Sequence, residues 1–320
     1  MLLTEFFQNN KFVNTKGAQD KPPVSTPSQL ERQVFLMAFP LTISTANPNN
    51  PWMKEIPEEK RKIDYEEAFS QFYNVYSFII SEGALAYLLP NEGNFQDQEY
   101  VANLGIYLPH LKDRNVIVLS NFTSQPRQGE EKVGQKFLKQ MKYDVHMAPT
   151  KWEGEADLKY LRENIYVGGY GLRTKKETYE WMEEKFDMKV IPIRMTDKKL
   201  YHFDTLFLRL GPNKVLIPTS VLEKEDIKAI EKYAEIVDLP IDVAATGCFN
   251  AVPCGKYMMY ADPHHLMTAP TPKMFDGVDK YLNIVQTATG LKPRAFNLNQ
   301  FERSGADMGC LIMHLNYQGF

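Results

Sequence analysis

The sequence predicts an α/β fold: a five-fold pseudo-symmetric α/β propeller, built from repeated ββαβ units in a single domain. Five amphipathic helical stretches alternate with short runs rich in β-branched and aromatic residues. The helix starts recur at intervals of roughly 45–65 residues, and periods near this length are typical of repeat architectures. Each interval can hold a few short strands and one helix. An ordinary mixed α/β domain remains the alternative, because spacing alone does not separate the two folds.

The individual elements are predicted from local apolar periodicity. In the third helical stretch, Tyr179, Met182 and Phe186 recur at helical spacing between glutamates. The predicted helices cover residues 65–81, 130–143, 175–186, 223–234 and 272–289. The predicted strands cover residues 34–39, 116–119, 165–167, 190–193, 206–210, 215–217, 257–260 and 311–315.

Composition limits the class of protein. The chain has 320 residues, 43% of them hydrophobic, so it can bury one large core or two modest ones. A formal net charge of −3 gives no basis for binding a phosphate backbone, so we expect a small-molecule substrate and no nucleic acid. Three cysteines suit a reducing compartment, and no apolar run approaches the ~18 residues of a membrane helix. We therefore expect a cytoplasmic protein that does not contact a membrane.

The N-terminal region differs in composition from the rest of the chain. From about residue 8 to residue 29 it is rich in Asn, Gln, Lys, Pro and Ser and poor in large apolar residues. The start also lacks the basic region and long apolar run of a signal peptide. We expect a flexible N-terminal arm over residues 1–30 and the α/β-propeller catalytic domain over residues 31–320.

Cys310 is the strongest candidate for chemistry. It follows Gly305 and Gly309, where the backbone can approach a ligand closely. A thiol with an ordinary pKa of ~8.5 needs an electropositive setting to act as a thiolate, and a cationic substrate would supply one. The alternative is a small buried structural residue, and that role fits Cys248 and Cys254.

His202 and Asp204 are two residues apart in an apolar run. On a strand both side chains would point to the same face, while Tyr201 and Phe203 would face the core. A satisfied core histidine beside a surface aspartate is the alternative. If Asp204 points inward, it should meet a positive group, because burying an unpaired carboxylate is costly.

Two further groups of charged residues are candidates for binding a charged partner. Glu153 and Glu155 would share a face if their segment is extended, so one of them could orient a cation or the histidine; a solvated loop is the alternative. Arg127 and Arg173 each lie at a turn before a helix, where either could bind a carboxylate in bidentate fashion or remain solvated.

Neither a metal nor a cofactor is predicted. The pair His264 and His265 has only Asp262 as a partner at metal-ligand spacing, so we interpret it as a loop. The glycines at 168–171 lack the Lys-Ser/Thr of a phosphate-binding loop.

Taken in order, these motifs resemble the guanidino-group-modifying superfamily, which contains arginine deiminases, arginine dihydrolases, dimethylargininases and amidinotransferases. The similarity extends from about Val34 to Asn316. It rests on seven pieces in the family's order: Asn50-Pro51-Trp52-Met53, residues 97–104, Arg127-Gln128-Gly129-Glu130, Glu153-Gly154-Glu155-Ala156-Asp157, Gly171-Leu172-Arg173-Thr174, Tyr201-His202-Phe203-Asp204-Thr205 and Cys310. The resemblance implies the five-fold propeller.

The resemblance also implies roles for the reacting residues. Cys310 would attack the guanidinium carbon, and His202 would protonate the leaving nitrogen and then activate water. Asp204 and Glu153 would hold the guanidinium by charge-assisted hydrogen bonds, with Glu155 in reserve for Glu153. Glu153 is thus counted with Cys310 and His202 in the catalytic group.

At the amino-acid end of a substrate, the resemblance implies a second set of contacts. Asp97 would receive the α-ammonium group, and Arg127 and Arg173 the α-carboxylate. Asn50 and Asn103 complete the implied substrate-binding set.

Two departures from the family pattern bear on the substrate. Many relatives have an acid where this chain has Asn103, and the arginine dihydrolase and deiminase-like branch also carries Asn there. The turn before the nucleophile reads Gly305-Ala306-Asp307 where relatives often have consecutive glycines. Added bulk at this turn would narrow or reshape the pocket.

The resulting hypothesis is a cofactor-free hydrolase of the guanidino group of arginine, giving citrulline, or ornithine after a second hydrolysis. Asp204 favours arginine over a dimethylated substrate, because two carboxylates reward unsubstituted N–H groups. The alternatives are an amidinotransferase, a dimethylargininase, and a non-catalytic arginine-binding protein. A homodimer is the default expectation for a soluble enzyme.

Overall fold

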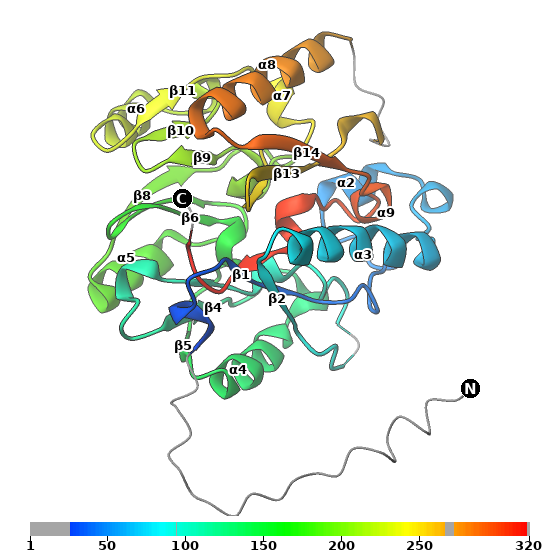
Figure 1. The fold of residues 1–320 in the computed structure, drawn as a ribbon, viewed down its shortest axis with the longest axis horizontal. Coiled ribbons are helices and arrows are strands. Elements are labelled where there is room, and N and C mark those ends of the chain that lie inside the picture. Colours follow the sequence, from blue (N-terminus) through cyan, green and yellow to red (C-terminus); the bar gives the residue numbers. More distant parts are fainter. Residues whose placement is uncertain (1–25, 94, 266–271, 319–320) are drawn as a thin grey trace, which may run out of the picture.

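A repeated three-stranded sheet organises the computed structural model, which describes residues 26–93, 95–265 and 272–318 (Figure 1). In one unit, β3 (Gly105–Tyr107) pairs antiparallel with β4 (Val116–Leu119). The chain then passes through α4 (Glu130–Gln140), and β5 (Asp144–Met147) pairs parallel with β4. A parallel pair requires a crossover connection, which explains why each unit contains a helix.

Three further units have the same order of strands and the same pairing. Their elements are β6 (Leu158–Arg162), β7 (Ile165–Tyr170), α5 (Lys176–Phe186) and β8 (Lys189–Arg194); β9 (Leu208–Gly211), β10 (Lys214–Leu216), α6 (Lys224–Glu231) and β11 (Glu235–Val237); and β12 (Val252–Cys254), β13 (Tyr257–Ala261), α8 (Pro272–Thr289) and β14 (Lys292–Phe296).

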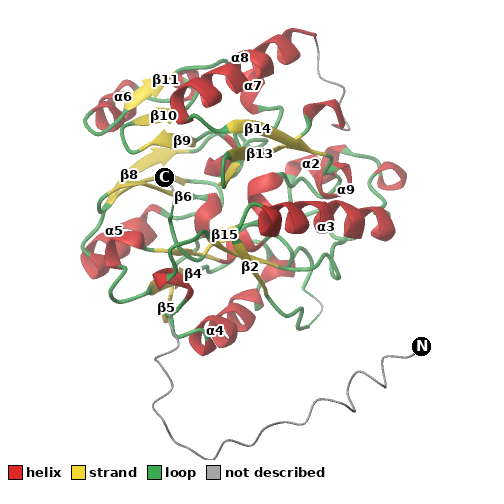
Figure 2. Ribbon diagram, in the orientation of Figure 1, coloured by secondary structure: helices red, strands yellow, loops and turns green. Residues whose placement is uncertain are grey.

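The fifth unit joins the two ends of the chain. β1 (Val34–Met37) pairs parallel with β2 (Leu85–Leu88) across α3 (Tyr65–Ser81). Its antiparallel partner is β15 (Met313–His314), which places Phe35 opposite His314. The helices lie around the outside and the strands towards the middle (Figure 2). Five such units within the described residues confirm the predicted five-fold α/β propeller.

Helix boundaries follow the sequence prediction closely. The first and fifth predicted helices match α3 and α8 in both bounds. The second was predicted to reach residue 143 but ends at Gln140, and Lys142 takes a left-handed φ of 68°. The α5 helix ends at Phe186, as predicted, and Asp187 after it has a φ of 48°. Residues in this conformation stop a helix, and at Lys142 the apolar periodicity does not reveal the stop.

The prediction of strands was wrong at two functionally important places. His202 and Asp204 do not lie on a strand, because residues Phe203–Thr205 form a 3₁₀ turn that begins directly after His202. The hydroxyl of Thr205 donates to the backbone carbonyl of His202 at 2.7 Å. Met308–Leu311 is a second 3₁₀ turn, so only Met313–His314 of the predicted strand 311–315 forms a strand. Side chains such as Thr205 that bond to nearby backbone favour turns over strands.

The predicted N-terminal arm lies mostly outside the described residues. Its last part, however, is packed on the body of the molecule: Pro27 and Ser28 are buried. The side-chain amide of Asn316 donates to the carbonyls of Leu30 and Arg32 at 3.2 and 2.8 Å. The predicted boundary at residue 30 therefore falls within a packed segment. None of the described helices is long and apolar enough to cross a membrane.

Candidate active site

Two cavities meet at Cys310 and His202. We call them the polar cavity and the wide cavity, and Tyr201, Gly305 and Ala306 line both. The polar cavity holds about 320 Å³ of empty space and is also lined by Asn49, Asn50, Asp97, Tyr100, Asn103, Arg127, Arg173 and Ser304. The wide cavity holds about 770 Å³, counting its open mouth, and is also lined by Trp52, Ile56, Leu200, Asp204, Thr205, Ala244, Ala245, Gly247, Glu302 and Asp307.

The turn that carries Cys310 is fixed by Asn250. The amide N–H of Gly309 donates to Oδ1 of Asn250 at 2.6 Å, and that of Cys310 donates to the same oxygen at 3.3 Å. A Cβ on Gly309 would lie 2.9 Å from this oxygen, so the glycine permits the close approach. Sequence reasoning missed Asn250, because no motif distinguishes it from other loop asparagines.

The surroundings of Cys310 favour the protonated form of its thiol. Burial raises the pKa of the Cys310 thiol far above its usual range, and the nearby charges of Asp204 and Asp307 raise it further. A cation bound between the thiol and these carboxylates would have the opposite effect. The site therefore suits a nucleophile that is activated by a positively charged ligand.

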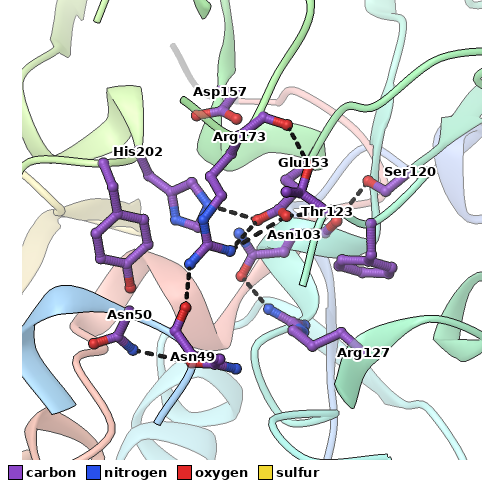
Figure 3. A network of polar contacts seen from close by, with 12 residues as sticks. Asn49, Asn50, Asn103, Ser120, Thr123, Arg127, Glu153, Asp157, Arg173 and His202 are labelled. Carbon is purple, nitrogen blue, oxygen red and sulfur yellow. Dashed lines mark hydrogen bonds and ion pairs between the residues drawn. The ribbon is translucent and has the colours of Figure 1, made fainter. Parts of the chain in front are cut away.

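His202 is held by Glu153. Nε2 of His202 lies 2.8 Å from Oε2 of Glu153, which has no solvent exposure. The other oxygen, Oε1, accepts the amide N–H of Thr123 at 3.0 Å, and Arg173 donates to both oxygens (Figure 3). Burial alone would raise the pKa of Glu153, but Arg173 and His202 hold it well below its usual range. Glu153 is therefore an ionised group that orients the imidazole.

This arrangement corrects the role implied for Glu153 at the guanidinium. Its oxygens are occupied by protein donors, and Glu153 lines neither cavity. Glu155 is directed elsewhere: its carboxylate pairs with His314, at 2.8 Å from Nδ1 and 3.0 Å from the backbone nitrogen. Of the two glutamates, Glu153 is the one beside His202.

Asp204 faces the wide cavity as a buried carboxylate. It is 2% exposed, and neither of its oxygens has a hydrogen-bond partner among the described residues. Burial raises the pKa of Asp204, against the opposing charges of Lys159 and His202. An unpaired buried carboxylate is costly, so this position is well suited to receive a cationic ligand.

Asp97 provides a second unsatisfied carboxylate, in the polar cavity. Its Oδ2 accepts the side-chain amide of Asn49 at 2.7 Å, while Oδ1 has no partner among the described residues. Burial raises the pKa of Asp97, and Arg127 opposes the rise. The residue also holds a φ of 71°, an uncommon conformation for a residue with a side chain.

The two arginines of the polar cavity differ in how many of their N–H groups are available to a ligand. Arg127 uses Nε and Nη2 on the carboxylate of Glu130 at 2.9 and 2.8 Å. Its remaining contacts go to the carbonyl of Tyr100 and to Oδ1 of Asn103, so one of its five N–H groups is left. Arg127 therefore acts mainly as part of the cavity wall.

Arg173 has more capacity to bind a ligand. Its Nη1 donates to Glu153 and its Nη2 to the carbonyl of Asn49 at 2.9 Å, and no hydrogen bond from its Nε occurs among the described residues. Its guanidinium lies over the ring of Tyr201, 4.7 Å from the centroid. Tyr201 thus fixes Arg173 from one side, a role that the sequence did not reveal.

The two predicted asparagines shape the cavity. Oδ1 of Asn103 accepts from Arg127 at 2.8 Å, and its Nδ2 has no partner among the described residues. Asn50 caps the helix α2 (Pro51–Glu55), since its Oδ1 accepts the N–H of Met53 at 2.9 Å. Its Nδ2 donates to the carbonyl of Ser304 at 2.7 Å, which ties α2 to the turn before Cys310.

A family model described as "N,N dimethylarginine dimethylhydrolase, eukaryotic" matches residues 38–314. The chain is 28% identical over 200 residues to the bifunctional arginine dihydrolase/ornithine cyclodeaminase AgrE of Nostoc sp., covering 62% of this chain and 27% of that protein. It is 25% identical over 273 residues to the bifunctional enzyme of the same description, ArgZ, of Synechocystis sp., covering 83% and 35%. The chain thus spans about a third of these relatives or less.

Solved structures show the same fold. The substrate-bound N-terminal domain of ArgZ, described as an arginine dihydrolase from cyanobacteria, superimposes with a TM-score of 0.72 and 22% identity over 89% of this chain and 99% of that domain. Unliganded AgrE gives a TM-score of 0.75 and 22% identity, covering 90% and 40%. A dimethylarginine dimethylaminohydrolase adduct gives 0.64 and 14%, covering 88% and 99%.

Proposed function

Because the chain belongs to the family described as N,N dimethylarginine dimethylhydrolase, eukaryotic, we propose that it hydrolyses the guanidino group of arginine through a covalent intermediate on Cys310. The observation that carries this proposal is the meeting of Cys310 and His202 at the junction of two cavities. Each cavity contains a buried carboxylate with at least one oxygen that accepts no hydrogen bond from the described residues. One nucleophile, one proton carrier and two cation-binding groups are the parts that the reaction requires.

The reaction begins when the guanidinium binds beside Asp204. Its positive charge offsets the charges of Asp204 and Asp307, which lowers the pKa of the Cys310 thiol. The thiol releases its proton to solvent, and the thiolate sulfur forms a bond to the central carbon of the guanidinium. A carbon–nitrogen bond of this tetrahedral adduct then breaks. The leaving nitrogen takes its proton from His202, so that ammonia departs and a thiouronium on Cys310 remains.

Water completes the turnover. His202, now neutral, takes a proton from water while the water oxygen attacks the same carbon. The carbon–sulfur bond breaks, citrulline is released, and the Cys310 thiol recovers its proton. Glu153 keeps the imidazole in place and stabilises its charged form through the 2.8 Å contact. A second hydrolysis, of citrulline, would release ammonia and leave a carbamate on the δ-nitrogen of ornithine. Breaking of the carbon–nitrogen bond of this carbamate then gives ornithine and carbon dioxide.

The polar cavity suits the amino-acid end of arginine. Asp97 offers a free carboxylate oxygen for the α-ammonium group, and Arg173 offers its Nε for the α-carboxylate. The relatives AgrE and ArgZ are named as arginine dihydrolases, which supports arginine as the substrate. Asn103 contributes a free amide to the same cavity.

One experiment tests the proposal against its alternatives. The protein is incubated with arginine, with and without glycine as an amine acceptor, and ammonia, citrulline and ornithine are measured. Ammonia and citrulline or ornithine without acceptor support hydrolysis, while product only with acceptor shows amidino transfer. No product, with arginine still raising the melting temperature, shows a binding protein.

Two expectations about the protein in the cell go with this function. We expect the enzyme to act in the cytoplasm and to form a homodimer. Light scattering coupled to size-exclusion chromatography tests the dimer, and fractionation of cells tests the compartment.

A further inference from the structure

Asp307 is a charged residue of the wide cavity that the mechanism above uses only through its effect on Cys310. Its backbone carbonyl accepts the N–H of Cys310 at 3.2 Å, so Asp307 lies at the start of the turn that carries the nucleophile. Its side chain lines the same cavity as Cys310, His202 and Asp204. No hydrogen bond or ion pair reaches the carboxyl group of Asp307 in the part of the chain that the structure describes.

The carboxyl group of Asp307 is placed against Gly247. A Cβ on Gly247 would lie 2.5 Å from Oδ2 of Asp307, so the glycine leaves room for the carboxyl group at this wall. The φ of Gly247 is +76°, which residues with a side chain rarely adopt. The position of the carboxyl group is thus built into the local backbone.

The charge of Asp307 depends on its neighbours. Burial and then the charge of Asp204 raise the pKa of Asp307 to about 7. Asp204 itself is surrounded by His202, Lys159 and Glu155, and the Cys310 thiol faces both aspartates. Two carboxyl groups near one thiol repel each other when both are ionised, and a bound cation would remove this repulsion.

The two cavities define how a substrate would extend past the nucleophile. With the amino-acid end in the polar cavity and the reacting carbon at Cys310, the outer guanidino nitrogens would point into the wide cavity, which Asp204 and Asp307 line. Unmethylated nitrogens supply N–H donors to both carboxylates, whereas methyl groups would leave buried acceptors without partners.

We propose that Asp307, acting with Asp204, makes this site select an unmethylated guanidino group over a methylated one. This inference rests on the proposed function, which supplies the orientation of the substrate. It assigns a role in substrate specificity to Asp307, which lies in the turn Gly305-Ala306-Asp307, where relatives often have consecutive glycines. Asp204 alone offers one carboxylate, and Asp307 adds the second acceptor that a dimethylated nitrogen cannot satisfy.

The test compares kcat/KM for arginine and for Nω,Nω-dimethylarginine in the wild-type protein and in Asp307→Asn, which keeps the size of the side chain. We expect the wild type to prefer arginine and the variant to lose about tenfold to a hundredfold of that preference, mainly through arginine. KM for arginine should fall as the pH rises through about 7 in the wild type. This dependence should be weaker in Asp307→Asn, in which Asp204 remains. The matched control is Glu55→Gln, which removes an exposed carboxylate of α2.

The outcomes separate this inference from the proposed function. A wild-type protein that turns over neither compound would overturn the proposed function. In that case calorimetric binding of the same two compounds to Cys310→Ser, with and without Asp307→Asn, still decides the inference. If Asp307→Asn loses kcat/KM equally for both compounds, or if the wild type prefers the dimethylated compound, the inference is overturned and the proposed function is not. If Asp307→Asn lowers the melting temperature, Asp307→Ala provides the second variant, with the same loss of preference expected.

Discussion

The imidazole of His202 lies 2.8 Å from the carboxylate of Glu153, and Glu153 has no contact with solvent. Glu153 comes from the loop before β6, and His202 from the loop after β8. The pair therefore exists only because two loops of one propeller unit return to the same place. The two residues have different roles at the site. Glu153, bonded to Arg173, holds the imidazole in position, and His202 is the group that can exchange protons with a ligand.

Replacing the nucleophile should abolish turnover without removing the binding site. We expect Cys310→Ala to lose at least about 10³-fold in kcat with arginine, because no other thiol lines the two cavities. Arginine should still raise its melting temperature. The control is Cys254→Ala, in β12, which should keep kcat within a few-fold. Full activity of Cys310→Ala would refute the covalent mechanism.

Removing the charge of Glu153 should slow the chemistry more than it weakens binding. Glu153→Gln retains the shape of the side chain but no longer stabilises a protonated His202, so kcat should fall by about 10²–10⁴-fold while KM changes little. Steady-state kinetics at constant pH measures this. Glu155→Gln is the matched control, because Glu155 pairs with His314 and lines neither the polar cavity nor the wide cavity. If both variants lose kcat equally, Glu153 has no special relationship with the imidazole.

The alkylation rate of Cys310 should report the charges around it. Because the pKa of the thiol is raised, a neutral reagent such as iodoacetamide should label Cys310 at pH 8 more slowly than it labels free cysteine. Asp204→Asn removes a negative charge, which lowers the thiol pKa, increases the thiolate fraction and speeds labelling. Mass spectrometry of the Cys310 peptide across pH gives both rates. An unchanged pH profile in Asp204→Asn would show that the two groups do not interact.

Asp97 should recognise the α-ammonium group and nothing else of the substrate. Asp97→Asn should raise KM for arginine by about tenfold or more. The same change should have little effect on 5-guanidinopentanoate, which lacks the α-ammonium group. Asparagine tolerates the left-handed φ of 71° at this position, so the backbone is preserved. Parallel losses on both compounds would mean that the substitution had disturbed the whole cavity.

Asn316 should contribute to stability by fastening the N-terminal segment. Its side chain donates to three backbone carbonyls, including those of Leu30 and Arg32, and accepts the N–H of Val34 at 2.9 Å. We expect Asn316→Ala to lower the free energy of unfolding by about 1–3 kcal/mol, as measured by urea denaturation. Gln318→Ala, at an exposed position, should change it by less than about 0.5 kcal/mol.

Local patterns were sufficient to place the helices, whereas the five-fold repeat was predicted from helix spacing together with the family resemblance. The helices α3 and α8 match their predicted bounds because a long apolar face at helical spacing is itself a local property. Several strands were missed, among them β14, whose five residues include Lys292, Pro293 and Arg294. Short strands with so many polar residues show no alternation that a sequence pattern can detect, and their pairing partners stabilise them instead.

By itself the sequence determined the residue types at the site: Cys310, His202, Asp204, Glu153 and the arginines stand in motifs whose order resembles one superfamily. Only the tertiary structure decided which of them meet and what each is free to bind. Glu153 is bonded to His202 and Arg173, whereas neither carboxylate oxygen of Asp204 accepts a hydrogen bond from the residues that the structure describes. The reason is physical: hydrogen bonding and burial depend on contacts between segments far apart in the chain, such as β15 with β1, and spacing along the sequence does not encode them.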